Sequence, residues 1–205
     1  MPGRFFLTTP LSDLGAALGL DLNGIQTGPR ANVAPGEEIL AVTEDRQPRM
    51  MRWGLIPQGR VNARGRPVLE TLINARGETV FRKSAFAGLK RAIVPADGWY
   101  EWTGKARAKT AWRLRRADGA PLAFAAVWDV WTAPGGREIA QVATVTCEPN
   151  REVAEIHHRM GVILAQDDFA TWLDGVPAQA EALIRPATNG SIGIAKATGV
   201  DWDAP

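Results

Sequence analysis

Cysteine and histidine are scarce in this sequence of 205 residues. There is one cysteine, Cys147, and the only two histidines are neighbours, His157 and His158. A single cysteine excludes an internal disulfide and a CxxC metal knuckle. So few thiolate and imidazole ligands also argue against a zinc site. We therefore expect neither a metal ion nor a cofactor.

Long apolar runs are also missing. No stretch approaches the roughly 18 consecutive apolar residues that indicate a membrane-spanning helix, and the start of the chain lacks the charged-then-apolar pattern of a secretory signal. The composition, 45% hydrophobic and 22% charged, is typical of a globular protein. We expect a single domain over residues 1–205, a monomer, a cytoplasmic location and no membrane partner.

Acidic residues are scarce in one part of the chain. The net charge is only +2, yet between positions 79 and 116 the only acids are Asp97 and Glu101. Basic residues alternate with aromatic ones there: Arg82, Lys83, Lys90, Arg91, Lys105, Arg107, Lys109, Arg113, Arg115 and Arg116. Such a segment is either a solvated face balanced by acids elsewhere or a groove for nucleic acid. The asymmetry favours the groove.

Tryptophan, in contrast, is abundant. The chain has eight tryptophans and one tyrosine. A tryptophan side chain is costly to expose unless it packs or stacks on something. We expect most of the eight in the core and a few in a surface that stacks on bases.

The periodicity of apolar residues predicts many strands and a few short helices. Helices are expected over residues 12–20, with Ser12 as the N-cap, and over 79–89, 149–156, 167–173, with Asp167 as the cap, and 177–184. Strands are expected over 39–42, 51–55, 92–95, 99–103, 111–115, 121–128, 139–147 and 161–165. This pattern predicts an α+β fold, with a curved and mainly antiparallel sheet or barrel flanked by short helices.

The segment INAR contains an amide and a guanidinium on one face. Asn74 and Arg76 lie two residues apart, so on an extended segment their side chains point the same way. The rigid fork of an arginine suits a phosphate. The alternative is a structural asparagine in a loop and an arginine in a salt bridge.

Glu101 stands between two aromatic residues in the segment WYEW. A carboxylate among large rings is desolvated, which raises its pKa and suits it to general acid–base catalysis. The alternative is an ordinary exposed glutamate on a strand.

The adjacent histidines of IHHR cannot both point into one site, since neighbouring side chains diverge. Histidine is the usual proton shuttle near neutral pH, and the alternative is a hydrogen-bonded structural residue. Both histidines of the chain occur here, which favours a functional role for one of them.

Several short motifs, taken in order, resemble the SOS-response-associated peptidase (SRAP) family of abasic-site processing proteins. The resemblance covers essentially the whole chain. It rests on Gly3-Arg4-Phe5, Asn32-Val33-Ala34-Pro35-Gly36, Trp53-Gly54, Asn74-Ala75-Arg76, Pro95 with Gly98 to Trp102, and Ile156-His157 with Arg159. It implies a protein of the DNA damage response that binds an abasic site in single-stranded DNA or at a junction of single strand and duplex.

The resemblance also implies roles for individual residues. The catalytic positions of the family fall on Pro2, Asn74, Glu101 and His157. Arg4 and Arg76 match arginines near the DNA backbone, and Pro35 and Trp53 match apolar residues of the DNA-binding face. Asn32, from the NVAPG motif, and Arg82, from the basic segment, complete the DNA-binding candidates.

Position 2 departs from the family. The family has a cysteine there, which becomes the first residue when Met1 is removed, and its amine and thiol close a thiazolidine ring on the aldehyde of the opened sugar. Pro2 has no thiol. Cys147 lies in a strand pattern and is expected to be a buried small residue. A thiazolidine therefore cannot form by the family's route.

Three explanations of Pro2 remain open. In the first, the nucleophile has been lost and the protein binds DNA without a covalent link. In the second, Met1 is removed and Pro2 attacks the aldehyde with its secondary amine, of which a useful fraction is neutral at pH 7 because the pKa of an α-amine is about 8. In the third, the chain has another role. The family name implies a peptidase, and removal of the chain's own Met1 is the one such cleavage that we expect.

Overall fold

Two β-sheets form the body of the protein in the computed structural model, which describes residues 2–57, 63–65, 69–82, 86, 88–105 and 108–203. The first sheet is five-stranded and antiparallel, in the order β12-β8-β7-β1-β2. Its strands are β1 (Arg4–Leu7), β2 (Arg30–Val33), β7 (Gly98–Thr103), β8 (Thr110–Arg116) and β12 (Ile192–Lys196).

The second sheet closes on itself. Its order is β11-β10-β4-β3-β6-β9, and β9 also pairs with β10, so that β10, β4, β3, β6 and β9 form a ring; β5 is added on β10. Among the strand pairs of this sheet within the described residues, β10–β4 and β10–β5 are parallel and the others are antiparallel. The strands are β3 (Glu38–Thr43), β4 (Pro48–Trp53), β5 (Asn74–Arg76), β6 (Lys90–Ala96), β9 (Leu122–Thr132), β10 (Glu138–Cys147) and β11 (Met160–Gly161). The predicted α+β fold with a barrel-like, mainly antiparallel sheet is confirmed.

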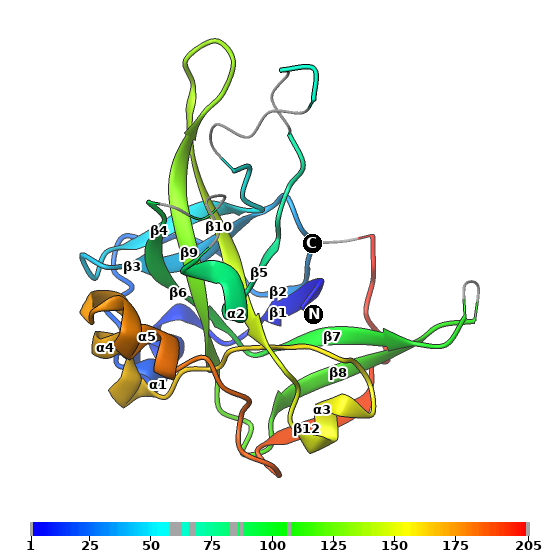
Figure 1. Ribbon diagram of the computed structural model, residues 1–205. Coiled ribbons are helices and arrows are strands. Elements are labelled where there is room, and N and C mark those ends of the chain that lie inside the picture. Colours follow the sequence, from blue (N-terminus) through cyan, green and yellow to red (C-terminus); the bar gives the residue numbers. More distant parts are fainter. Residues whose placement is uncertain are drawn as a thin grey trace.

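Short helices flank the sheets. They are α1 (Leu11–Leu18), α2 (Gly77–Val80), α3 (Arg151–Ala154), α4 (Phe169–Asp174) and α5 (Pro177–Ala182), with a 3-10 turn, η2 (Gln166–Asp168), before α4. In Figure 1, α1, α4 and α5 gather on one side of the barrel and α3 lies beside β12. In the same view the described chain begins at β1, and its red C-terminal segment ends to the right of β2 and above β7.

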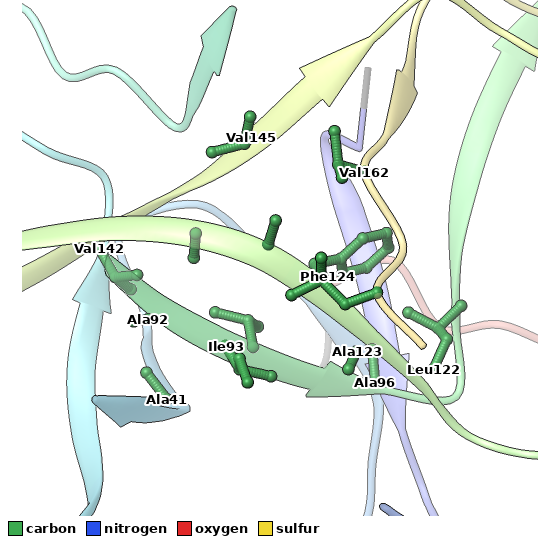
Figure 2. Close-up of a cluster of buried hydrophobic side chains, with 14 of the residues drawn as sticks. Ala41, Ala92, Ile93, Ala96, Leu122, Ala123, Phe124, Val142, Val145 and Val162 are labelled. Carbon is green, nitrogen blue, oxygen red and sulfur yellow. The ribbon is translucent and has the colours of Figure 1, made fainter. Parts of the chain in front are cut away.

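The core fills the barrel and the space between the two sheets. Figure 2 shows Ile93 of β6, Phe124 of β9 and Val142 of β10 converging with small alanines around them. Strand β9 is buried continuously from Leu122 to Trp128, because both of its faces are covered, which explains its uninterrupted apolar run. Two ring contacts join the five-stranded sheet to the barrel. They are Phe5–Trp53, with centroids 5.0 Å apart, and Trp99–Phe124, at 5.8 Å.

The helix predicted over 79–89 is wrong in its bounds. Helix α2 begins at Gly77 and ends at Val80, and the next two residues form a turn. Residues 83–85 and 87 lie outside the described residues. The apolar spacing serves tertiary contacts instead, since Phe81 packs on Trp172 with centroids 6.2 Å apart and Leu89 packs against the core. Tertiary packing overrides a weak helical propensity.

Other boundaries also moved. Helix α1 begins at Leu11 after Pro10, whose carbonyl accepts from the Leu14 N–H, so Ser12 is not the cap. Asp167 lies in the 3-10 turn rather than at a helix cap. Helix α3 begins at Arg151, because the Asn150 side chain caps it by accepting from the Val153 N–H, and it ends at Ala154. The strand predicted over 161–165 is limited to β11 and one bridge between Phe124 and Ile163.

Candidate active site and nucleic-acid interface

Pro2 is buried where the start of β1 meets β5 and β11. Its carbonyl oxygen accepts a hydrogen bond of 2.8 Å from Nδ2 of Asn74. The other side of that amide is fixed as well, because Thr144 Oγ1 donates to Asn74 Oδ1 at 2.5 Å. Gly161 makes the space, since a Cβ there would come within 3.3 Å of Pro2 Cγ and 2.5 Å of the Phe124 ring. Asn74 therefore holds the Pro2 carbonyl, and Gly161 leaves room for the Pro2 ring.

Glu101 faces the same region from β7. Arg4 pairs with Tyr100 in the antiparallel register of β1 and β7, so continuing that register brings Gly3 level with Glu101. Side chains alternate along a strand, which puts Glu101 on the inner face together with the buried Trp99. Glu101 is only 4% exposed. Burial is the main cause that raises the pKa of its carboxyl group to about 7.

His157 is half-buried, whereas His158 is exposed. The backbone fixes the His157 ring. The Arg159 N–H can donate to Nδ1 of this ring at 3.0 Å, and the Arg159 carbonyl oxygen lies 3.1 Å from the same nitrogen, so the backbone of Arg159 holds the ring in either tautomer. The ring stacks on His158 with centroids 4.3 Å apart. Burial is the main cause that lowers the pKa of His157. The neutral imidazole is thus favoured.

The loop that carries His157 is anchored by Arg159. This guanidinium is nearly buried and pairs with Glu78 of α2, with Nη2 2.8 Å from Oε2. It also donates to the Thr146 carbonyl oxygen at 2.7 Å. The Glu78 carboxylate is stabilised in return, since its hydrogen bonds with Arg159 lower its pKa. Arg159 is therefore a positioning residue.

Electrostatics link Glu101 and His157 to the start of the chain. The positive charge of the amino terminus is a further influence on both groups, and it lowers the pKa of each after burial has acted. The Glu101 carboxyl group, of pKa about 7, and the His157 imidazole are thus coupled to the start of the chain, where the Asn74 amide binds the Pro2 carbonyl. These groups can donate, accept and transfer protons near neutral pH.

Arg4 and Asn32 lie together on the outer face of the five-stranded sheet. Arg4 Nη1 donates to Asn32 Oδ1 at 2.6 Å and to the Trp202 carbonyl oxygen at 3.1 Å. Asn32 is buried, and its Nδ2 donates to the Asp201 carbonyl oxygen at 3.1 Å. Both DNA-binding candidates therefore hold the C-terminal segment in this structure.

Trp53 belongs to the core. Its side chain is fully buried, with Nε1 donating to the Ile73 carbonyl oxygen at 3.0 Å, so it offers no surface to DNA in this conformation. Its backbone instead supports the turn that carries Pro35. The Gly36 N–H donates to the Trp53 carbonyl at 2.7 Å, and Gly36 has φ 93°, which favours glycine. Pro35 itself is exposed at this turn.

The two remaining arginine candidates differ. Arg76 is exposed at the end of β5, whereas Arg82 pairs with Glu181 of α5 at 2.5 Å. Other cations of the basic segment are also paired, since Lys90 meets Glu44 at 2.9 Å and Arg116 meets Asp118 at 2.5 Å. These three ion pairs neutralise part of the basic segment over residues 79–116, and the expectation of a nucleic-acid groove there stays a prediction.

Cys147 is buried, as predicted. Burial raises the pKa of its thiol to about 12, so this thiol cannot replace the one that position 2 lacks. Among the described residues, no group of three or more His, Cys, Asp or Glu side chains could hold a metal ion. The described helices are all too short or too polar to cross a membrane.

Sequence reasoning missed Thr144 and Trp202. Thr144 fixes the Asn74 amide, and the pairing of β5 with β10 that brings them together is long-range. Trp202 packs on Tyr100, with centroids 5.0 Å apart, from a C-terminal segment without a regular pattern. The available signal was the pair of acids on either side of Trp202, which is a polar setting for so large a ring.

Comparisons with known proteins identify relatives along most of the chain. The model of the SOS response associated peptidase (SRAP) family matches residues 1–198. The abasic site processing protein YoaM of Bacillus subtilis is 35% identical over 85% of this chain and 79% of its own length, and YoqW of the same organism is 32% identical over 91% and 87%. A crystal structure of a Bacteroides thetaiotaomicron protein has the same fold, with a TM-score of 0.82, 21% identity and coverage of 96% and 92%.

Proposed function

This chain belongs to the SRAP family, and on that premise we propose that it processes abasic sites in DNA through the amine of Pro2. The substrate is an abasic site in single-stranded DNA or at a junction with duplex, and the protein acts in the cytoplasm as a monomer, on the nucleoid. Removal of Met1 is the one peptide cleavage that the proposal requires. The named relatives YoaM and YoqW, both abasic site processing proteins, support the substrate class.

One observation carries the choice of Pro2 as nucleophile. Position 2 is buried and held by Asn74, beside a carboxyl group whose pKa is about 7. A protein that had only lost its thiol has no need to maintain a desolvated glutamate there, because burial of an ionisable group costs stability. Proline also suits the role, since its nitrogen remains a secondary amine when Met1 is removed.

The first half of the reaction forms an iminium ion. The Pro2 nitrogen adds to C1′ of the open sugar, and the resulting carbinolamine loses its hydroxyl group as water. Protonated Glu101 supplies the proton for that water, which leaves a Glu101 carboxylate and a positively charged C=N bond. Asn74 keeps the Pro2 backbone in position, as its 2.8 Å hydrogen bond to the Pro2 carbonyl indicates.

The second half breaks the DNA strand. The Glu101 carboxylate takes a proton from C2′, the electron pair moves toward the iminium nitrogen, and the C3′–O bond breaks so that the phosphate leaves with its electrons. Glu101 is then protonated again, and water releases the sugar fragment from Pro2. His157, held neutral by burial, is positioned to relay a proton to the departing oxygen.

Binding uses the exposed candidates. Arg76 contacts a phosphate next to the abasic site, and Pro35 at the tip of its turn wedges against a neighbouring base. Arg82 contributes less, because Glu181 neutralises it. Trp53 acts indirectly by supporting the Pro35 turn.

Borohydride trapping tests this function. A single-stranded oligonucleotide with one abasic site is incubated with the protein, with and without borohydride, and the products are separated on a denaturing gel. We expect a crosslink only with the reductant and strand cleavage without it. The same oligonucleotide with an intact base is the matched control, and mass spectrometry of the protein establishes whether Met1 has been removed.

The alternative function is binding alone. It is favoured by Arg4 and the aromatic rings beside it, which suit DNA without any covalent chemistry. Tight binding of the abasic oligonucleotide with neither crosslink nor cleavage, in protein that lacks Met1, would contradict the Pro2 mechanism and support this alternative.

A further inference from the structure

The C-terminal strap, Asp201–Asp203, covers the outer face of the five-stranded sheet next to the start of β1. The Ala197 N–H donates to the Ala111 carbonyl at 2.9 Å, which continues the register of β12 on β8 by one residue. Beyond it the chain reaches β7, β1 and β2, where Trp202 and Asp201 make their contacts. Figure 1 shows this red segment rising past β7 to end near β2.

The strap is held by two kinds of contact. Its backbone carbonyls at Asp201 and Trp202 accept from Asn32 and Arg4. The Trp202 ring packs edge-on against Tyr100, at 5.0 Å between centroids, and against Trp102 at 5.3 Å. The surface beneath the strap therefore combines a cation, an amide and two aromatic rings.

These groups are those that bind a nucleotide of a single strand. Aromatic rings stack on bases without regard to sequence, and arginine forks bind phosphate oxygens. The strap presents matching chemistry, because a flat ring at Trp202 stands between two acids, as a base stands between two phosphates. Asp201 Oδ1 accepts from the Asp203 N–H at 3.0 Å, which folds the strap into a compact turn.

We propose that the outer face formed by Arg4, Asn32, Tyr100 and Trp102 is a subsite for a nucleotide that flanks the abasic site, and that the C-terminal strap occupies it until DNA binds. The inference rests on the proposed function, since it assumes that the strand passes Pro2. Arg4 lies two residues from Pro2, about 7 Å along an extended strand. That distance suits the neighbour of the reacting nucleotide.

The exchange of strap for DNA is favourable for Arg4. In the described chain, the Arg4 guanidinium donates to the Asn32 amide oxygen and to the Trp202 backbone carbonyl, and both of these acceptors are uncharged. A phosphate oxygen forms a stronger, charge-assisted hydrogen bond with the same nitrogen. Trp202 leaves the rings only when a base replaces it, so the strap also prevents those rings from binding other apolar surfaces.

The test compares wild type with Trp202→Ala for binding to the abasic oligonucleotide over a range of salt concentrations. Removing the competing ring is expected to lower Kd about three- to tenfold. The slope of log K against log salt should stay the same, because Arg4 contacts a phosphate in both complexes once the strap has left. Asp201→Asn with Asp203→Asn, which keeps the ring and the turn acceptor, is expected to lower Kd about twofold through reduced repulsion.

Trp131→Ala is the control, since Trp131 is a partly exposed ring on the β9–β10 hairpin away from the strap. In wild type, amide exchange over residues 197–203 should become faster when DNA binds, whereas a strap that is purely structural keeps its protection. A Trp202→Ala protein that binds the abasic oligonucleotide no tighter than wild type overturns the inference. If wild type itself does not bind abasic DNA, it is the proposed function that fails.

Discussion

The two faces of β1 and β7 differ although alternate residues of the same strands form them. On the inner face, Trp99 and Glu101 are buried against the barrel, and the carboxyl group has a pKa of about 7. On the outer face, Tyr100 and Trp102 lie beneath Trp202, and the cation Arg4 binds neutral oxygens. In the proposed mechanism, the inner face transfers protons and the outer face binds the strand.

Under this proposal, one short strand separates catalysis from DNA recognition. Successive side chains point to opposite sides of a sheet, so neighbouring residues such as Tyr100 and Glu101 experience different surroundings. Glu101 lies on the face that packs against the barrel core, and burial there raises the pKa of its carboxyl group to about 7. Changes on one face should therefore leave the properties of the other face largely intact.

The largest expected effect comes from Pro2→Cys, which alters the inner face alone. It supplies a thiol beside the same amine, so a crosslink to abasic DNA should form without any reductant, where wild type gives none. A denaturing gel after incubation without borohydride measures it. Pro2→Ser is the matched control, since it offers an amine and a hydroxyl group but no thiol. Absence of a stable crosslink in Pro2→Cys would show that the inner face no longer accommodates the sugar.

Glu101→Gln should slow strand cleavage by about 10²–10⁴-fold, the usual contribution of a general acid–base group. Affinity for the oligonucleotide should change little, because the outer face is untouched. In wild type the active form has a protonated Glu101, of pKa about 7, and a neutral amine, of pKa about 8, so the rate is bell-shaped with a maximum near pH 7.5.

The variant tests that assignment through its pH profile. Without the carboxyl group the decline above pH 8 should vanish, and the residual rate should rise to a plateau as the amine loses its proton. Single-turnover cleavage between pH 5 and 10 provides the comparison. An unchanged bell-shaped pH profile would mean that a group other than Glu101 causes the decline in rate at alkaline pH.

The same Glu101→Gln change should stabilise the fold at alkaline pH. The folded pKa, about 7, lies above the ordinary value of 4.5, so the stability linked to this group is fully present below pH 4.5 and is lost as the pH rises through 7. The variant should therefore match wild type near pH 4.5 and exceed it by up to about 3 kcal/mol at pH 8. Urea unfolding at both pH values measures this, and an equal gain at both would contradict it.

The smallest effect is expected for the arginines. Arg76→Gln should weaken binding a few-fold and reduce the salt slope by about 0.7, because one phosphate contact is lost. Arg82→Gln should do less, since Glu181 already neutralises Arg82. Arg46→Gln, at the β3–β4 turn and paired with Asp174, is the control. Equal effects of Arg76→Gln and Arg82→Gln would show that the Arg82–Glu181 ion pair does not decide which arginine contacts the DNA.

The sequence predicted the fold class and the longer strands well. Strands β6 to β10 have long alternating or continuous apolar runs, which identify strands from local pattern alone. The short strands β1, β2, β5 and β12 were not predicted, because three to five residues carry little periodicity and their pairing partners lie far away in sequence. The helix over 79–89 failed because its apolar residues pack against distant elements.

The residue types of the candidate site were predictable from the sequence. Which face of the sheet each side chain lies on, and what covers that face, was not. The position of Glu101 among aromatic residues indicated a raised pKa, and burial in the structure raises it. The strap over Arg4 and Asn32 depends on contacts between residues more than 160 positions apart, which no local pattern contains. Trp53 appeared as a DNA-binding candidate only through family resemblance, and packing against Phe5 places it in the core.

The most direct test of the account is to locate the covalent adduct. The complex trapped with borohydride on abasic single-stranded DNA is digested and its peptides are sequenced by mass spectrometry. The account predicts the reduced sugar on the nitrogen of Pro2, in chains that begin at Pro2. An adduct on a lysine side chain, or trapping of equal yield in chains that retain Met1, would contradict it.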